Sequence, residues 1–180
     1  MPTEERTHLT IVPLGVVDDL VLAVVAANLQ AVVGLNSDVG PRRPKPDYAY
    51  QHGRRQYDAG RIINALAAES GAVPLTLGIT REDLCTPILT FVFGESQLEG
   101  RAALISLHRI MDDNTEVTCT RAAKIALHEV GHLIGIGHCR TSGCLMCFSA
   151  TLEKLDGLNL WFCDACMVEL SRKLRHRFAT

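Results

Sequence analysis

Three histidines and a glutamate lie within residues 128–138, in the pattern H-E-x-x-H-x-x-G-x-x-H. Residues four apart on an α-helix share one face, about 6 Å apart along the axis, so His128 and His132 can offer two imidazoles to one Zn²⁺. Glu129 lies about 100° around the same helix, beside the metal, where a general base for a zinc-activated water is needed. The pattern therefore predicts two metal ligands and a catalytic base on one helical turn.

A glycine after this turn allows a third histidine to reach the same point. Gly135 tolerates positive φ, so it can end the helix and reverse the chain. His138 then arrives from outside the helix as a third nitrogen ligand. Three protein ligands leave a fourth coordination position open, which is typical of catalytic zinc. The short form of the pattern also fits an amphipathic helix with a buried histidine, but the glycine and the third histidine favour the metal site.

Four cysteines farther along the chain predict a second metal site. Cys139 and Cys144 form a C-x4-C pair, and Cys163 and Cys166 form a C-x2-C pair. Four thiolates make a closed tetrahedral zinc site that contributes to folding. Unrelated buried thiols and a redox pair are the alternatives, but the density of cysteines and the absence of a thioredoxin-like context favour zinc. Cys147 is an extra thiol to which the sequence assigns no role.

The two predicted sites are adjacent in the sequence, because His138 and Cys139 are consecutive. A zinc ion bound by the cysteines would hold in place the loop that carries the third histidine. We therefore expect the substitution Cys139→Ser to weaken zinc binding at the histidine site, although it removes none of that site's ligands.

Residues 128–166 resemble the archaemetzincin family of metzincin zinc metalloproteases, whose sequences join the histidine helix to a four-cysteine zinc site. The resemblance implies an α/β metzincin-like zincin fold, with a mixed twisted sheet packed on helices that include the zinc-binding helix, and a small cysteine-rich C-terminal part that binds zinc. It implies that Met146 packs beneath the catalytic zinc without binding it. It also implies that an edge strand, within residues 89–93 or 102–107, receives the substrate backbone.

The elements that must position these residues alternate between strand and helix, which favours an α/β layered fold. The expected zinc helix ends at Gly135 and has Thr118 or Thr120 as its N-terminal cap. Short apolar runs predict the strands, and capping residues followed by apolar periodicity predict the helices. The expected strands are residues 9–14, 74–79, 89–93 and 102–107, with the last two antiparallel, and the other expected helices are residues 18–33, 58–69 (ended by Gly71) and 164–175.

A chain of 180 residues fits one compact catalytic domain. Within it we expect an N-terminal α/β subdomain, residues 1–135, that contains the active-site helix. Residues 136–180 are expected to form a small C-terminal subdomain with the four-cysteine zinc site and a terminal helix. The other histidines (His8, His52, His108 and His176) are expected at the surface or in the core, and the basic residues near the C-terminus are expected to be structural.

Composition limits the partners and the compartment. A net charge of −2 gives no electrostatic basis for binding nucleic acid. The apolar run at residues 16–35 contains Asp18 and Asp19, so we expect no membrane span. Residues 1–6 lack the basic start of a signal peptide, which favours a cytoplasmic protein. Seven cysteines in that compartment indicate metal binding or free thiols rather than disulfide bonds. Separately, we expect the protein to be a monomer.

The sequence therefore predicts a zinc-dependent metallopeptidase with two Zn²⁺ per chain, one catalytic and one structural, acting on a peptide or protein. In this hypothesis Glu129 takes a proton from the zinc-activated water and delivers it to the leaving amine. One alternative is a zinc-stabilised binding or scaffold protein with a latent or shielded hydrolase site. A third hypothesis is a redox or metal-handling protein that uses the thiols.

Overall fold

A computed structural model describes residues 8–69 and 75–178 of the chain. Within these residues a five-stranded sheet has the order β2-β1-β5-β8-β7. The first four strands in this order are parallel, and β7 pairs antiparallel with β8 at one edge. The strands are β1 His8–Leu14, β2 Asn36–Val39, β5 Leu75–Thr80, β7 Gly94–Ser96 and β8 Ala102–Ser106.

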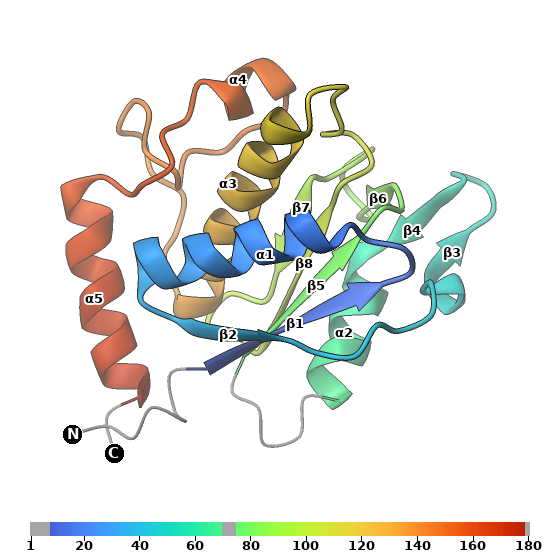
Figure 1. The fold of residues 1–180 in the computed structure, drawn as a ribbon, viewed down its shortest axis with the longest axis horizontal. Coiled ribbons are helices and arrows are strands. Elements are labelled where there is room, and N and C mark those ends of the chain that lie inside the picture. Colours follow the sequence, from blue (N-terminus) through green and yellow to red (C-terminus); the bar gives the residue numbers. More distant parts are fainter. Residues whose placement is uncertain (1–7, 70–74, 179–180) are drawn as a thin grey trace.

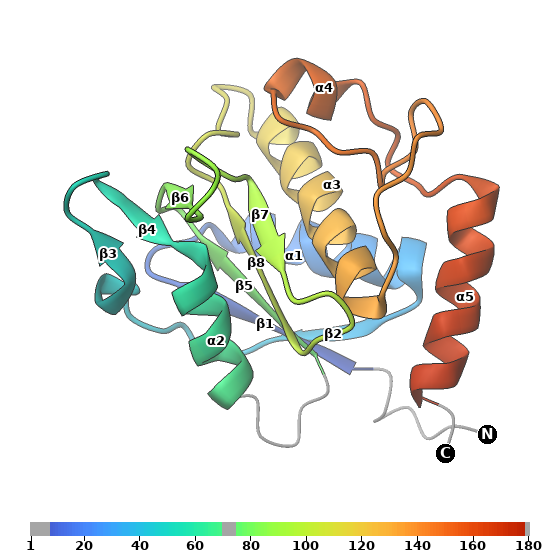
Figure 2. The ribbon, with the colours of Figure 1, turned by 180° about the vertical axis from the view of Figure 1, so that it is seen from behind.

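Helices cover both faces of this sheet (Figures 1 and 2). Helices α1 and α3 pack on one face in one cluster of buried apolar side chains, and α2 packs on the other face in a second cluster. The long helices are α1 Asp19–Asn28, continued by a π-helical turn at Leu29–Val33, α2 Ala59–Glu69, α3 Thr115–Ile134 and α5 Asp164–Phe178, and α4 Leu152–Asp156 is short. A small second sheet contains β3 Tyr50–Gln51, β4 Gln56–Asp58 and β6 Leu84–Cys85, after a 3-10 turn at Asp47–Ala49.

The first strand–helix unit forms as the sequence predicts. Strand β1 is apolar and largely buried on both faces, as expected for a parallel strand between helical layers. The Asp18 carboxylate accepts a hydrogen bond from the Leu20 backbone N–H at 2.8 Å and caps α1. Gly34, with φ of 75°, ends the following turn in the left-handed region. Asp58 caps α2 in the predicted way, by accepting a hydrogen bond from the Arg61 N–H at 3.1 Å.

The predicted cap of the zinc helix is wrong. Helix α3 begins at Thr115, and the side chain of Asn114 accepts a hydrogen bond from the Glu116 backbone N–H at 2.9 Å. Thr118 and Thr120 lie inside the helix, where Thr118 Oγ1 accepts from the Asp112 N–H at 2.9 Å. Asparagine is as good a cap as threonine or better, and the two residues that follow it, Thr115 and Glu116, are polar and exposed.

The predicted strand at residues 89–93 is also wrong, because the strand that pairs with β8 is β7, one segment later. Side chains occupy the backbone carbonyls of the earlier segment. The Arg54 guanidinium donates to the Leu89 carbonyl at 2.7 Å, and the Gln56 amide donates to the Thr90 carbonyl at 2.8 Å. The predicted antiparallel pairing is correct, with β7 in place of residues 89–93. Two further predictions concern residues outside the described ranges: Gly71 as the end of a helix and Pro74 as the start of a strand.

The terminal helix α5 packs against α3 and extends beyond the predicted residue 175 to Phe178. Arg177 donates to the Leu133 carbonyl near the end of α3 at 2.8 Å, and Lys173 pairs with Glu99. These two cations therefore have structural contacts, as the sequence predicts. Buried side chains of the first cluster extend from β1 to α5. The division of the chain into two subdomains between residues 135 and 136 stays a prediction. Across the described ranges, every helix is too short or too polar to cross a membrane.

Candidate active site

Helix α3 is held firmly enough to fix the side chains that it carries. It packs between β8 on one side and α1 and α5 on the others, and most of its residues from Thr118 to Ile134 are buried. His128, Glu129 and His132 project from its C-terminal half toward a cleft. A buried helix of this kind limits rotamer freedom and preorganises a ligand set.

Backbone carbonyls orient two of the three imidazoles. His128 Nδ1 lies 2.8 Å from the Leu145 carbonyl oxygen, and His132 Nδ1 lies 2.7 Å from the Ile136 carbonyl oxygen. A carbonyl oxygen can only accept, so each Nδ1 carries the proton and each Nε2 presents a lone pair. Burial lowers the pKa of His128 to about 4, so its ring is neutral and able to bind a metal at neutral pH.

Gly135 brings the third imidazole to the same point. Its φ of 101° ends α3, and the Ile136 N–H donates back to the Gly131 carbonyl at 2.9 Å. The Nε2 atom of His132 then lies 3.0 Å from that of His128 and 3.3 Å from that of His138. Ligand nitrogens of a tetrahedral zinc with bonds of about 2.0–2.1 Å are about 3.3 Å apart, so the three residues fit Zn²⁺.

Glu129 is enclosed beside the three imidazoles by strand β7. Its side chain is 7% exposed, and Ser96 Oγ donates a hydrogen bond to Oε2 at 2.8 Å. A Cβ at Gly94 would lie 2.7 Å from Glu129 Cγ, so only glycine leaves room for the carboxylate at that position of the strand. Burial raises the pKa of Glu129 to about 8, and a divalent cation on the neighbouring imidazoles would favour its ionised form.

The histidines and Glu129 open into a cleft of about 530 Å³. One wall is β7 with the segment before it, a second wall is α3, and a third is the loop at residues 147–150. The Phe148 ring packs against the His138 ring at a centroid distance of 5.4 Å. The lining of the cleft is mostly apolar, with a smaller number of polar side chains among the apolar ones.

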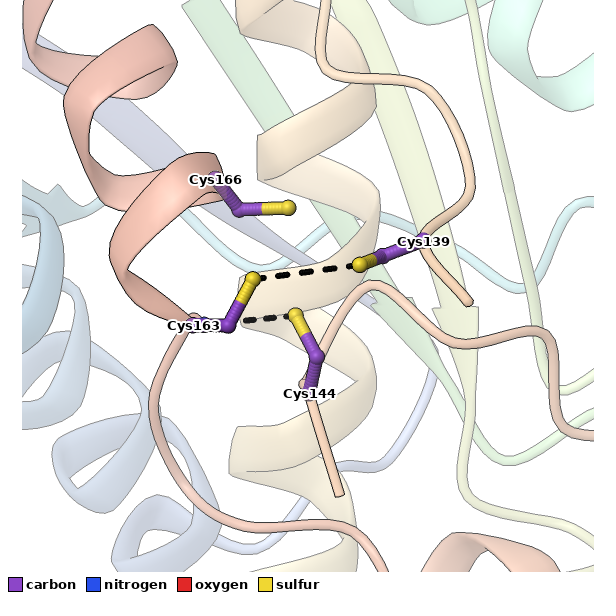
Figure 3. A group of neighbouring side chains, drawn as sticks. All are labelled: Cys139, Cys144, Cys163 and Cys166. Carbon is purple, nitrogen blue, oxygen red and sulfur yellow. Dashed lines mark hydrogen bonds between the residues drawn. The ribbon is translucent and has the colours of Figure 1, made fainter. Parts of the chain in front are cut away.

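The four cysteines converge on one point, with Cys139 and Cys144 in the segment after α3 and Cys163 and Cys166 at the start of α5 (Figure 3). The Sγ atoms of Cys139 and Cys163 are 3.8 Å apart, and all four Sγ atoms lie within 4.8 Å of one another. Sulfur ligands of a tetrahedral zinc with bonds of about 2.3 Å are about 3.8 Å apart, so the cluster fits Zn²⁺. Hydrogen bonds from the side chain and the backbone N–H of Thr141 lower the pKa of Cys139 to about 6, which favours the thiolate that a metal binds.

A short segment connects the cysteine cluster to the histidine cluster. The Cys139 N–H donates to the Met146 carbonyl at 2.9 Å, and the neighbouring Leu145 carbonyl is the partner of His128. Met146 is fully buried, and a Cβ at Gly131 would lie 2.6 Å from its Sδ atom. Met146 therefore packs closely under the histidine turn of α3, in the packing role that the resemblance implies.

Every predicted site residue falls in one of these two clusters or, for Glu129, beside the first. Among the described His, Cys, Asp and Glu residues, these are the two groups close enough to hold a metal. His8 instead pairs with Asp38 at 3.2 Å. Sequence reasoning missed Gly94 and Ser96, the residues of β7 that enclose Glu129, because nothing in their spacing relates them to α3.

In this chain a mixed sheet packs on a helix with two imidazoles, and the turn after the helix brings a third to the same point, beside a buried glutamate. This is the architecture of a zinc metallopeptidase of the metzincin type. The sequence profile of peptidase family M54 matches residues 50–172, more than half of the chain. The chain belongs to this family, the archaemetzincins.

Relatives and solved structures agree with this assignment. The chain is 38% identical to the archaemetzincin of Methanopyrus kandleri over 74% of this chain and 77% of the relative. It is 34% identical to that of Methanocaldococcus jannaschii over 91% and 92%, respectively. The crystal structure of the M. kandleri protein superposes with a TM-score of 0.85 at 32% identity, covering 94% of this chain and 97% of that one.

A zinc-dependent peptidase from Methanocorpusculum labreanum superposes with a TM-score of 0.83 at 25% identity, covering 90% of this chain and 99% of that one. The predicted family, the fold class and the assignment as a zinc metallopeptidase are therefore confirmed.

Proposed function

We propose that His128, His132 and His138 hold the catalytic zinc and that Glu129 is the general base for peptide-bond hydrolysis. The observation that supports this most strongly is the convergence of the three Nε2 atoms. The Nε2 atom of His132 lies 3.0 Å from that of His128 and 3.3 Å from that of His138, and the Nδ1 atoms of His128 and His132 are bonded to backbone carbonyls. Zinc bound at this point would polarise the scissile carbonyl and acidify the attacking water.

The environment of Glu129 suits proton transfer. Ser96 Oγ binds one carboxylate oxygen, which leaves the other for the proton of the water. Burial that raises the pKa of this carboxyl makes it a stronger base than an exposed glutamate, so it can take the proton and then release it to the leaving amine. The enclosure by β7 keeps the carboxylate in one place through both steps.

The substrate is a peptide or protein segment that adds to β7 as a further strand. Strand β8 is hydrogen-bonded on both sides, to β5 and to β7, so it has no free edge. Strand β7 has β8 on one side, lines the cleft, and contacts Glu129. In this proposal β7 is the strand that receives the substrate, in place of the two segments predicted from the resemblance.

The cysteine cluster is the structural site in this proposal, so a chain holds two zinc ions. A four-thiolate site has no open position for substrate, and its fit to zinc also accounts for the thiols without redox chemistry. A scaffold protein with a shielded site is the competing function. The cleft that reaches all three histidines favours hydrolysis.

The experiment is a comparison of zinc-loaded wild-type protein with Glu129→Gln on a peptide library, each with and without a chelator. Wild-type protein is expected to cleave peptides until zinc is removed. The variant is expected to keep both zinc ions and to lose at least about 10³-fold in kcat. Retained turnover in Glu129→Gln would contradict the base, and an inert wild-type protein with full zinc would favour the scaffold.

A further inference from the structure

A buried lysine lies in the wall of the cleft, away from the predicted ligands. Lys124 is one helical turn before His128 on α3, so it shares the face that carries His128 and His132, about 6 Å farther along the axis. Its side chain lines the cleft and is 7% exposed. Lysine is rarely buried to this extent without an anionic partner.

Lys124 has no carboxylate partner among the described residues. Its Nζ donates to the backbone carbonyls of Leu155 at 3.1 Å and Asp156 at 2.8 Å, which accounts for two of its three N–H groups. The Asp156 carboxylate is instead held by Arg121, whose Nε and Nη2 donate to its two oxygens at 2.8 and 2.7 Å. Burial lowers the pKa of Lys124, and the charge of the nearby Asp156 offsets this effect only in part.

A second, independent donor lines the same cleft. Ser149 Oγ is buried and has no hydrogen-bond partner within the described part of the chain. Ser149 belongs to the loop at residues 147–150, across the cleft from α3. A buried hydroxyl without a partner is destabilising, so this atom is suited to a ligand that supplies an acceptor.

The direction of β7 determines which part of a substrate reaches Lys124. Gly94 lies beside Glu129, and the Glu99 N–H donates to the His132 carbonyl at 3.0 Å, so β7 and α3 run in the same sense. A peptide that pairs antiparallel with β7 runs toward the start of α3. The residue that follows the scissile bond is therefore on the Lys124 side of the histidines.

We propose that Lys124 and Ser149 recognise a carboxylate on the substrate residue that follows the scissile bond. This proposal deepens the proposed peptidase function and depends on it. Lys124 supplies the charge and a free N–H, and Ser149 supplies a hydroxyl donor. The carboxylate is either the side chain of Asp or Glu or the free C-terminus of the same residue, because both lie within a few ångströms of the scissile carbonyl in an extended peptide.

The test uses zinc-loaded protein and amidated peptides that differ only in Glu or Gln after the scissile bond. Wild-type protein is expected to prefer Glu roughly 10- to 100-fold in kcat/KM, because a charged hydrogen bond replaces a neutral one. In Lys124→Met the Glu to Gln ratio is expected to fall toward one. A second pair of peptides that end at this residue, as free acid or as amide, distinguishes the side chain from the C-terminus.

A purely structural lysine would give a different result. Lys124 also binds carbonyls at the end of α4, so Lys124→Met is expected to lower the melting temperature as well. Thr151→Ala is the matched control, since it removes the side-chain cap of the same short helix α4 and leaves the charges around Lys124 unchanged. This control is expected to lower the melting temperature without lowering the Glu to Gln ratio.

Ser149→Ala keeps the proposal testable if Lys124→Met does not fold. Removal of a hydroxyl that has no partner is expected to spare stability and to reduce the ratio severalfold. A ratio near one in wild-type protein, or an unchanged ratio in both variants, would overturn the proposal while leaving the peptidase function intact. If wild-type protein cleaves none of these peptides, the proposed function fails, and calorimetric binding of the same peptides to zinc-loaded protein still compares Glu with Gln.

Discussion

At the scale of single residues, the placement of Glu129 depends on the absence of a side chain at Gly94. A Cβ at that position would lie 2.7 Å from Glu129 Cγ and 2.8 Å from Oε1. Gly94→Ala is therefore expected to displace the carboxylate by about 1 Å and to lower kcat about 10²-fold with both zinc ions still bound. The measurement is peptide turnover together with metal content.

Gly53→Ala is the control for this substitution, because a Cβ at Gly53 meets nothing within 4 Å. It is expected to leave turnover unchanged. Normal turnover in Gly94→Ala would contradict the claim that the placement of Glu129 depends on the absence of a side chain at Gly94.

The convergence of the candidate ligands and of the proposed general base could be predicted from the sequence, because a helix fixes the relative positions of His128, Glu129 and His132. The left-handed turn at Gly135 was predictable from the residue type. The partners that orient these side chains were not. The Leu145 carbonyl and the Ser96 hydroxyl approach through tertiary packing, and the Ile136 carbonyl approaches through the turn after the helix. Backbone carbonyls are common to all residues, so neither carbonyl has a signal in the sequence.

At the scale of elements, the segment from His138 to Met146 connects the two predicted metal sites. The backbone bond from Cys139 to Met146 and the contact of Leu145 with His128 belong to the same short stretch. Loss of the cysteine-bound zinc would loosen the loop that carries His138 and the carbonyl that orients His128. Cys139→Ser is therefore expected to weaken zinc at the histidines by roughly 10–100-fold, the usual effect of removing an orienting partner.

A zinc titration of the purified variant by calorimetry or with a competing chelator measures this effect. Cys147→Ser is the control in the same loop, because Cys147 is outside the cluster and a serine hydroxyl can replace its bond to the Thr141 carbonyl. This control is expected to bind zinc normally. Unchanged affinity at the histidines of Cys139→Ser would show that the two sites are independent.

Prediction at this scale succeeded where local signals and tertiary structure agree. The caps Asp18 and Asp58 satisfy backbone N–H groups that any helix start leaves open, so they are visible in the sequence. The apolar segment at residues 89–93 failed as a strand because side chains from β4 and the loop before it bind its carbonyls. A pattern of apolar residues cannot reveal that competition.

At the scale of the whole molecule, the order β2-β1-β5-β8-β7 places antiparallel β7 at an edge beside the zinc helix. The sequence predicted the layers, but the short β2 and the small sheet of β3, β4 and β6 carry too few residues for a periodic signal. The cytoplasmic location, the monomeric state and the lack of nucleic-acid binding stay predictions. The family assignment confirms the class of enzyme and of substrate.

The most direct test of the account is the zinc content of the purified protein and of one variant for each site. We expect two zinc ions per wild-type chain and one per chain of His132→Ala. The ion that remains in this variant is expected to resist mild chelation, because four thiolates hold it. A wild-type chain that binds one zinc under saturating metal, or a His132→Ala variant that still binds two, would contradict the placement of the catalytic metal on these three imidazoles.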